Sequence, residues 1–127
     1  MDKPHKILII DDNEELLDAL GNFFSMKKYQ VKCASNGLEG LKIIESEKEG
    51  FDLLITDLVM PNVSGVGVIS IMKKKYPKTP VVAITGWGEF PQALAEEARA
   101  DRILKKPFEL EELFGVVEGL MKRKVVM

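Results

Sequence analysis

The chain has 127 residues, 46% of them hydrophobic and 30% charged, which is typical of one globular domain and excludes disordered and fibrous proteins. A net charge of −2 lacks the basic excess that nonspecific nucleic-acid binding requires, so we expect no direct nucleic-acid partner. The single cysteine excludes an internal disulfide and a multi-cysteine zinc site, and the single histidine excludes Ser-His-Asp or Cys-His catalysis unless His5 is recruited.

Five short segments rich in branched apolar residues are expected to form parallel strands, since they are separated by enough residues for helical crossovers. The second alternates polar and apolar residues and the fifth is short and flanked by charge, so these two are predicted at the sheet edges. Cys33, in the second, is interpreted as a small core residue. The segments are Ile7–Ile10, Tyr29–Ala34, Leu53–Ile55, Val81–Ile84 and Arg102–Lys105.

Five helices are expected between and after these strands, which gives an α/β fold of five βα units. The first and last have clear amphipathic stripes, whereas glycines and β-branched residues weaken the third, which is predicted from context. The fourth is short and has Pro91 in its first turn. The predicted helices are Leu16–Phe24, Leu38–Ile44, Gly65–Lys75, Phe90–Arg99 and Leu110–Met121.

The polar residues at the ends of these strands predict the chemistry, because ligands of parallel α/β sheets bind beyond the carboxyl ends of the strands. Asp11 and Asp12 follow the first strand, Asp57 the third, Thr85 the fourth and Lys106 the fifth. Carboxylates held this close repel one another unless a cation lies between them, and an all-oxygen ligand set favours Mg²⁺. One of Asp11, Asp12 or Asn13 is also expected to cap the first helix.

Such a site is suited to phosphoryl transfer. A carboxylate can attack phosphorus and form an acyl phosphate when a metal and a positive side chain screen the phosphoryl oxygens. Lys106 supplies a positive charge, and the Thr85 hydroxyl can donate to a phosphoryl oxygen, which converts the chemical event into a change of loop position. Lys105 is expected to be a solvated side chain of the edge strand. The sequence therefore predicts a phosphorylation switch.

Four segments, in this order, resemble the motifs of the receiver domain of two-component response regulators. They are Ile7–Asn13 with its acidic pair, Leu54–Pro61 around Asp57, Val82–Gly86 with Thr85, and Leu104–Phe108 with Lys106. The resemblance covers nearly the whole chain, and it implies a CheY-like, flavodoxin-like fold with sheet order 2-1-3-4-5. It also implies one receiver domain over residues 1–127 with no effector domain, located in the cytoplasm, with no membrane partner.

The resemblance further implies that Asp57 accepts a phosphoryl group from a phosphohistidine of a sensor histidine kinase or a histidine phosphotransfer protein. Asp11, Asp12, Asp57 and the carbonyl of Val59 would hold Mg²⁺, and a cis peptide would join Lys106 to Pro107. The chain would act as a signalling phosphoacceptor, promoting only its own phosphorylation and dephosphorylation. Its output would be a partner-binding surface of the fourth helix, fifth strand and fifth helix, on a monomer or a phosphorylation-dependent dimer.

The sequence departs from the family pattern at Ile103, where receivers commonly have an aromatic residue that moves on activation. We therefore expect Ile103 to follow Thr85 in switching through packing, without a ring rotation. Arg99 replaces a frequent glycine before the fifth strand. Neither departure affects the phosphorylation chemistry.

Other functions are compatible with parts of this pattern. A receiver fragment of a larger regulator or hybrid kinase, and a protein-binding module that is never phosphorylated, remain alternatives. A flavodoxin-like flavin or nucleotide binder would need a phosphate-binding loop where Asp11 and Asp12 stand. A phosphatase of the haloacid dehalogenase type would need an acid two residues after Asp57, where Val59 stands.

Overall fold

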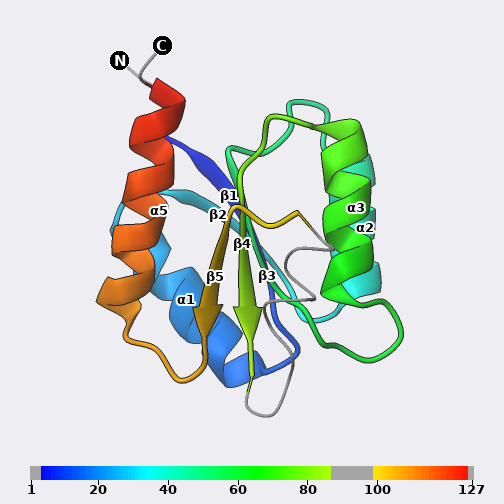
Figure 1. Ribbon diagram of the computed structural model, residues 1–127, viewed down its shortest axis with the longest axis horizontal. Coiled ribbons are helices and arrows are strands. Elements are labelled where there is room, and N and C mark those ends of the chain that lie inside the picture. Colours follow the sequence, from blue (N-terminus) through cyan, green and yellow to red (C-terminus); the bar gives the residue numbers. More distant parts are fainter. Residues whose placement is uncertain (1–3, 87–98, 126–127) are drawn as a thin grey trace.

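The computed structural model describes residues 4–86 and 99–125, which form a parallel five-stranded sheet with helices on both faces (Figure 1). The strand order is β2-β1-β3-β4-β5, which confirms the predicted doubly wound fold and both edge strands. The elements in chain order are β1 (Lys6–Ile10), α1 (Glu14–Met26), β2 (Gln30–Ala34), α2 (Gly37–Ser46), β3 (Leu53–Asp57), α3 (Gly65–Lys75), β4 (Val81–Thr85), β5 (Arg102–Lys105) and α5 (Leu110–Val125).

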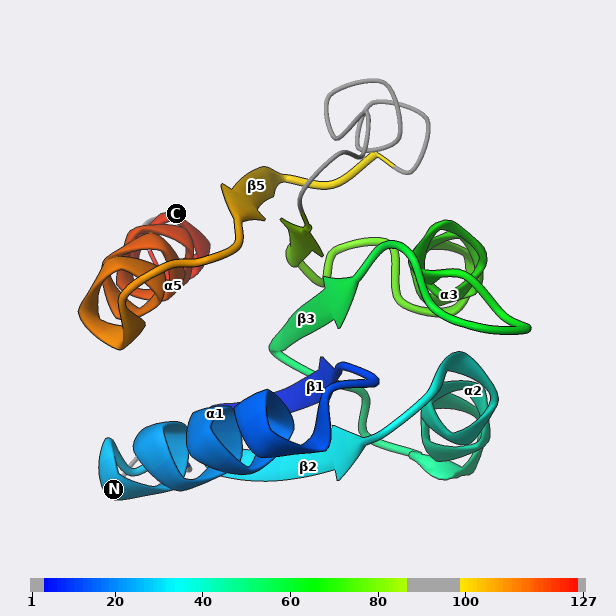
Figure 2. The ribbon, with the colours of Figure 1, turned by 90° about the horizontal axis from the view of Figure 1, so that it is seen from below.

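The core consists of two apolar layers separated by the sheet. Helices α1 and α5 cover one face, and α2 and α3 cover the other (Figure 2). Because successive side chains of a strand point to opposite faces, Ile7 and Ile9 pack in the first layer and Leu8 and Ile10 in the second. Both faces of β3 and β4 are covered, so every residue of these strands is buried. Their apolar runs are therefore continuous.

The edge strand β2 corrects one expectation, because Cys33 is exposed and does not belong to the core. Cys33 pairs with Ile9 of β1 and so faces the α1 layer. There its Sγ lies close to Gly21, which offers no side chain to cover it. The cause is the edge position, since β2 has a neighbouring strand on one side only.

Each of the first three helices begins at a residue whose side chain accepts a backbone N–H from the first turn. These N-caps are Asn13, Asn36 and Ser64. The third predicted helix is confirmed as α3 despite its glycines. The fourth predicted helix, 90–99, falls outside the described residues except for Arg99, which has a positive φ of 63°. Within the two described ranges, no helix is long and apolar enough to cross a bilayer.

Candidate functional site

Three aspartates meet at the carboxyl ends of β1 and β3. One carboxylate oxygen from each of Asp11, Asp12 and Asp57 lies within 4.8 Å of the other two. Asp11 is 0% exposed and Asp57 is 4% exposed, whereas Asp12 faces solvent. Burying two carboxylates away from water costs folding free energy unless cations and hydrogen bonds stabilise them. This cost indicates a functional reason for the arrangement.

The start of α1 shows why both aspartates are free to enter the site. Asn13 caps the helix by accepting the N–H of Leu16 at 3.0 Å, so neither Asp11 nor Asp12 performs that task. The backbone of this turn also positions the first acid, because the N–H of Asn13 donates to Asp11 Oδ1 at 2.9 Å. The N–H of Asp11 donates to the carbonyl of Ala34, at the end of β2.

Lys106 brings a positive charge into the same place from the end of β5. Its Nζ lies 3.0 Å from Asp57 Oδ2 and 3.1 Å from Asp11 Oδ2. The N–H of Lys106 donates to the carbonyl of Thr85 at 2.7 Å, which ties the lysine to the end of β4. The peptide bond between Lys106 and Pro107 is cis. Lys105 is exposed, as expected for an edge-strand side chain.

The pKa values of Asp57 and Lys106 depend on two factors, which are burial and the charges of neighbouring side chains. Burial raises the pKa of Asp57 above its ordinary value, the hydrogen bond and charge of Lys106 oppose that rise, and the negative charge of Asp11 adds to it. Burial lowers the pKa of Lys106, but its contacts with Asp57 and Asp11 outweigh this effect, so that pKa lies above its ordinary value. Lys106 is therefore an ammonium at neutral pH, and the fold disfavours the ionised form of Asp57.

Two buried oxygen atoms of the site have no hydrogen-bond partner within the described part of the chain. One is Asp11 Oδ2, which has the ion pair with Lys106 but no well-directed donor, and the other is the hydroxyl oxygen of Thr85. Buried polar atoms are almost always hydrogen-bonded, so each of these is an incomplete interaction. Both atoms belong to residues that are 0% exposed at the carboxyl ends of β1 and β4.

The loop after β3 holds Asp57 by its backbone. The N–H of Val59 donates to Asp57 Oδ1 at 3.2 Å, so the second oxygen of this carboxylate also has a partner. Gly65 closes the loop, because its N–H donates to the carbonyl of Leu58 at 2.8 Å. A Cβ at position 65 would lie 2.0 Å from the carbonyl oxygen of Asp57.

Gly65 is therefore a positioning residue for Asp57. Sequence pattern alone indicates only that this glycine weakens the third helix. The available signal was a glycine at the start of a predicted helix, eight positions after a candidate site aspartate. Glycine at a helix start is tolerated for several reasons, so this signal alone could not distinguish a close backbone contact.

The residues present fit a hard divalent cation. Carboxylate oxygens are the preferred ligands of such ions, and Asp11 Oδ2 is a buried acceptor to which no described residue donates a hydrogen bond. The cluster of Asp11, Asp12 and Asp57 is the group of acids suited to a metal within residues 4–86 and 99–125. Three negative charges facing one ammonium also leave an excess of negative charge, which a cation would neutralise.

Ile103, the residue expected to move with Thr85, lies on β5. Its register partner is Ala83 of β4, and two positions further Lys105 pairs with Thr85. Its side chain is 39% exposed. The two predicted switch residues thus occupy adjacent strands, and the predicted fourth helix that would complete their surface falls outside the described residues.

Comparisons of the sequence and of the structure with known proteins point to the same protein family. The response regulator receiver domain family matches residues 7–118. Transcriptional regulatory protein GlrR of Escherichia coli K12 is 31% identical over 122 residues, which are 95% of this chain and 27% of that protein. The chain thus spans about a quarter of the length of this relative.

Two solved structures illustrate the structural similarity. A response regulator receiver domain protein of Clostridium thermocellum is 31% identical, with a TM-score of 0.85, and the match covers 94% of this chain and 96% of the other. The response regulator TrrA of Thermotoga maritima, solved in complex with Mg²⁺ and BeF, is 30% identical, with a TM-score of 0.80, over 91% and 98% of the two chains.

Proposed function

The chain belongs to the response regulator receiver domain family, and on this premise we propose that Asp57 accepts a phosphoryl group from a phosphohistidine. The donor is a sensor histidine kinase or a histidine phosphotransfer protein. A carboxylate oxygen of Asp57 forms the new bond to phosphorus as the bond from phosphorus to the histidine nitrogen breaks, and that nitrogen keeps the bonding pair. The observation that carries the proposal is the buried Asp57 carboxylate paired with Lys106, whose ammonium also pairs with the buried Asp11.

The roles of the other residues follow from their contacts. The N–H of Val59 and the ammonium of Lys106 orient the Asp57 carboxylate, and Lys106 is placed to attract the incoming phosphoryl oxygens. Asp11, Asp12, Asp57 and the carbonyl of Val59 are proposed to hold Mg²⁺. The metal would neutralise the excess negative charge of the acids and of the phosphoryl group.

Thr85 is proposed to convert phosphorylation into a conformational signal. Its hydroxyl is buried and has no hydrogen-bond partner among the described residues, so a phosphoryl oxygen on Asp57 would offer it an acceptor. Movement of Thr85 would act on β4 and, through packing, on Ile103 of β5. The downstream protein is proposed to bind the predicted fourth helix, β5 and α5. The chain is proposed to be a monomer or to dimerise on phosphorylation.

The biological setting also belongs to the proposal. The chain promotes its own phosphorylation and dephosphorylation and turns over no other substrate, and it works in the cytoplasm. The relatives include proteins named as transcriptional regulators that are several times longer than the matched segment. The expected lack of a nucleic-acid partner is therefore not supported for a longer protein containing this chain, and the alternative of a fragment of a larger regulator remains open.

The test uses acetyl phosphate as a small phosphoryl donor with and without Mg²⁺. We expect intact-mass analysis to show one added phosphoryl group only with Mg²⁺, removed by hydroxylamine as an acyl phosphate should be. Asp57→Asn should abolish the addition, whereas Asp18→Asn, which removes an exposed carboxylate on α1, should not change it. Equal phosphorylation of the Asp57 variant would contradict the proposal. Asp12→Asn should mainly weaken Mg²⁺ binding, and Lys106→Ala should slow phosphorylation while retaining the metal.

A further inference from the structure

Thr56 is a polar residue inside an apolar layer of the core. Its side chain is 0% exposed. Its register partners are Ile10 of β1 and Ala83 of β4, which both belong to the layer under α2 and α3. Leu54, two positions earlier on the same face of β3, belongs to this layer as well. A hydroxyl in such a place costs free energy unless it is hydrogen-bonded, and valine would fill nearly the same volume without that cost. The hydroxyl of Thr56 therefore indicates a role that packing alone does not supply.

The hydroxyl of Thr56 is bonded to the backbone of the proposed phosphoacceptor. It donates to the carbonyl of Asp57 at 2.9 Å. The start of α3 packs against the same carbonyl, because a Cβ at Gly65 would lie 2.0 Å from its oxygen. The carbonyl of Asp57 is thus contacted both by the side chain of Thr56 and by the first residue of α3.

The backbone that follows Asp57 is engaged at each of its next polar groups. The N–H of Leu58 donates to the carbonyl of Ile84 on β4 at 3.0 Å, and the carbonyl of Leu58 accepts the N–H of the first residue of α3 at 2.8 Å. The N–H of Val59 donates to Asp57 Oδ1 at 3.2 Å. With the bond from Thr56, both peptide units between Asp57 and Val59 have their N–H and their carbonyl engaged. These contacts hold the torsion angles of Asp57 and Leu58, which determine where Val59 lies.

We propose that Thr56 is a positioning residue for Mg²⁺ binding, and this inference rests on the proposed function. Its hydroxyl holds the peptide unit that follows Asp57, and that unit sets the position of Val59. The N–H of Val59 orients the Asp57 carboxylate, and its carbonyl is a proposed ligand of the metal. Without the hydroxyl the loop can adopt other arrangements, so that Mg²⁺ has to order the loop as it binds.

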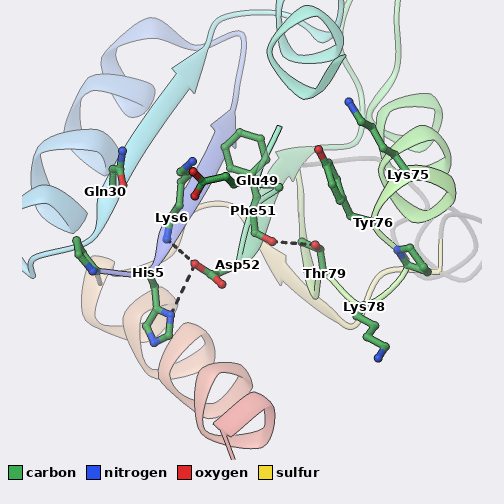
Figure 3. A pocket seen from close by; sticks show the side chains of 13 residues that line it. His5, Lys6, Gln30, Glu49, Phe51, Asp52, Lys75, Tyr76, Lys78 and Thr79 are labelled. Carbon is green, nitrogen blue, oxygen red and sulfur yellow. Dashed lines mark hydrogen bonds and ion pairs between the residues drawn. The ribbon is translucent and has the colours of Figure 1, made fainter. Parts of the chain in front are cut away.

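A second buried threonine provides a matched control. Thr79 is 5% exposed, and its hydroxyl donates to the carbonyl of Phe51 at 2.8 Å (Figure 3). This bond has the same chemistry as the bond of Thr56, but it joins the loops before β3 and β4, at the amino end of the sheet. The three aspartates lie at the carboxyl end. Thr56→Val and Thr79→Val each remove one buried hydroxyl, and only the first removes it beside the proposed metal site.

The first measurement is the affinity for Mg²⁺. The ion is titrated into the ¹⁵N-labelled parent and variants at a temperature where all of them are folded, so that a change in stability alone does not alter the Kd. We expect Thr56→Val to raise the Kd for Mg²⁺ by at least about fivefold, because groups that orient metal ligands commonly contribute this much or more. Thr56→Ser, which keeps the hydroxyl, and Thr79→Val should both stay within about twofold of the parent.

The second measurement needs no metal. In EDTA, the exchange of the Val59 amide proton with water reports how firmly this N–H is held by the Asp57 carboxylate. Thr56→Val should speed this exchange by about threefold or more, because the loop is no longer held through the carbonyl of Asp57. Thr56→Ser and Thr79→Val should leave the exchange rate within about twofold of the parent.

Three outcomes would overturn the role of Thr56. Equal Mg²⁺ affinities of Thr56→Val and Thr79→Val would show that the position of the lost hydroxyl does not matter. A Thr56→Ser variant as weak as Thr56→Val would show that the methyl group, and not the hydroxyl, is required. Unchanged exchange of the Val59 amide in Thr56→Val would show that the hydroxyl does not hold the loop. A parent that binds no Mg²⁺ would instead contradict the proposed function itself.

Discussion

The acidic residues at the two ends of the sheet differ in how completely their hydrogen bonds and ion pairs are formed. At the amino end, Asp101 accepts the N–H of Val81 at 2.7 Å and the ammonium of Lys73 at 3.2 Å, and Glu47 is paired with Lys6. At the carboxyl end three aspartates lie together, the ammonium of Lys106 pairs with Asp57 and Asp11, and Asp11 Oδ2 has no hydrogen bond within the described residues. At the amino end, charged side chains link different elements of the fold. At the carboxyl end, some buried polar groups lack hydrogen bonds with other described residues. The difference separates residues that stabilise the fold from residues available for reaction.

The largest expected effect comes from the backbone contact that supports the carboxyl end. Gly65→Ala should lower the free energy of unfolding by at least about 3 kcal/mol, because the new Cβ would overlap the carbonyl of Asp57. Gly67→Ala is the control in the same helix, where a Cβ would meet nothing closer than 3.9 Å. It should be neutral or stabilising by up to about 1 kcal/mol. Urea unfolding measures both, and similar losses would show that the contact at Gly65 is not special.

The next largest effect is expected from removing the contacts of an acidic residue at the amino end of the sheet. Asp101→Ala should cost about 2 kcal/mol, because it leaves the N–H of Val81 without an acceptor and removes the carboxylate that holds Lys73. Asp18→Ala, which removes an exposed carboxylate of α1, should change stability by less than about 0.5 kcal/mol. If thermal unfolding shows equal changes for the two variants, the amino-end acids do not stabilise the fold as their contacts indicate.

A smaller effect, of opposite sign, is expected from the proposed phosphoacceptor. Because burial raises the pKa of Asp57, the folded state disfavours its carboxylate, and stability falls as pH rises from the ordinary aspartate range through the raised value. Asp57→Asn should therefore be more stable than the parent at pH 7 in EDTA, with the difference shrinking as the pH approaches 4. Unfolding curves at several pH values test this, and a less stable variant at pH 7 would contradict it.

Glu47 provides the matching test at the amino end. The hydrogen bond from Lys6 lowers the pKa of Glu47, so its carboxylate is favoured in the folded state. This contribution is present above the ordinary glutamate pKa and is lost as the pH falls through the lowered value. Glu47→Gln should therefore be less stable than the parent at pH 7, and the deficit should shrink in acid. The same sign for Glu47→Gln and Asp57→Asn would remove the contrast between the two ends.

The smallest effect is expected away from both ends, on the outer surface of α5. Gly115 and Gly119 are helical, and a Cβ at either position would meet nothing within 4 Å. Alanine at each should raise stability by about 0.5 to 1 kcal/mol, because it restricts the unfolded chain and favours the helix. Phosphorylation by acetyl phosphate should not change. Destabilisation by either substitution would contradict the open space that surrounds these two glycines in the structure.

Several features of the fold could be predicted from the sequence because they depend on neighbouring residues. The continuous apolar runs at Ile7 and Val81 predicted strands buried on both faces, and the alternation before Ala34 predicted an edge. The position of Asp57 after such a run placed it at the carboxyl end of the sheet. The interpretation of Cys33 as a core residue was wrong because β2 is an edge strand and the residue of α1 above Cys33 is Gly21, which has no side chain to cover it.

By itself, the sequence determined the alternation of strands and helices and the polar residues that end each strand, since hydrophobic periodicity is a local property of the chain. Only the tertiary structure decided how these residues meet. Lys106 reaches Asp57 across 49 positions and Asp11 across 95, and the clash that excludes a side chain at Gly65 involves the backbone of another element. At the amino end, the loops before β3 and β4 likewise meet through the hydrogen bond from the hydroxyl of Thr79 to the carbonyl of Phe51. Such contacts depend on the packed geometry of distant segments, which no local pattern specifies.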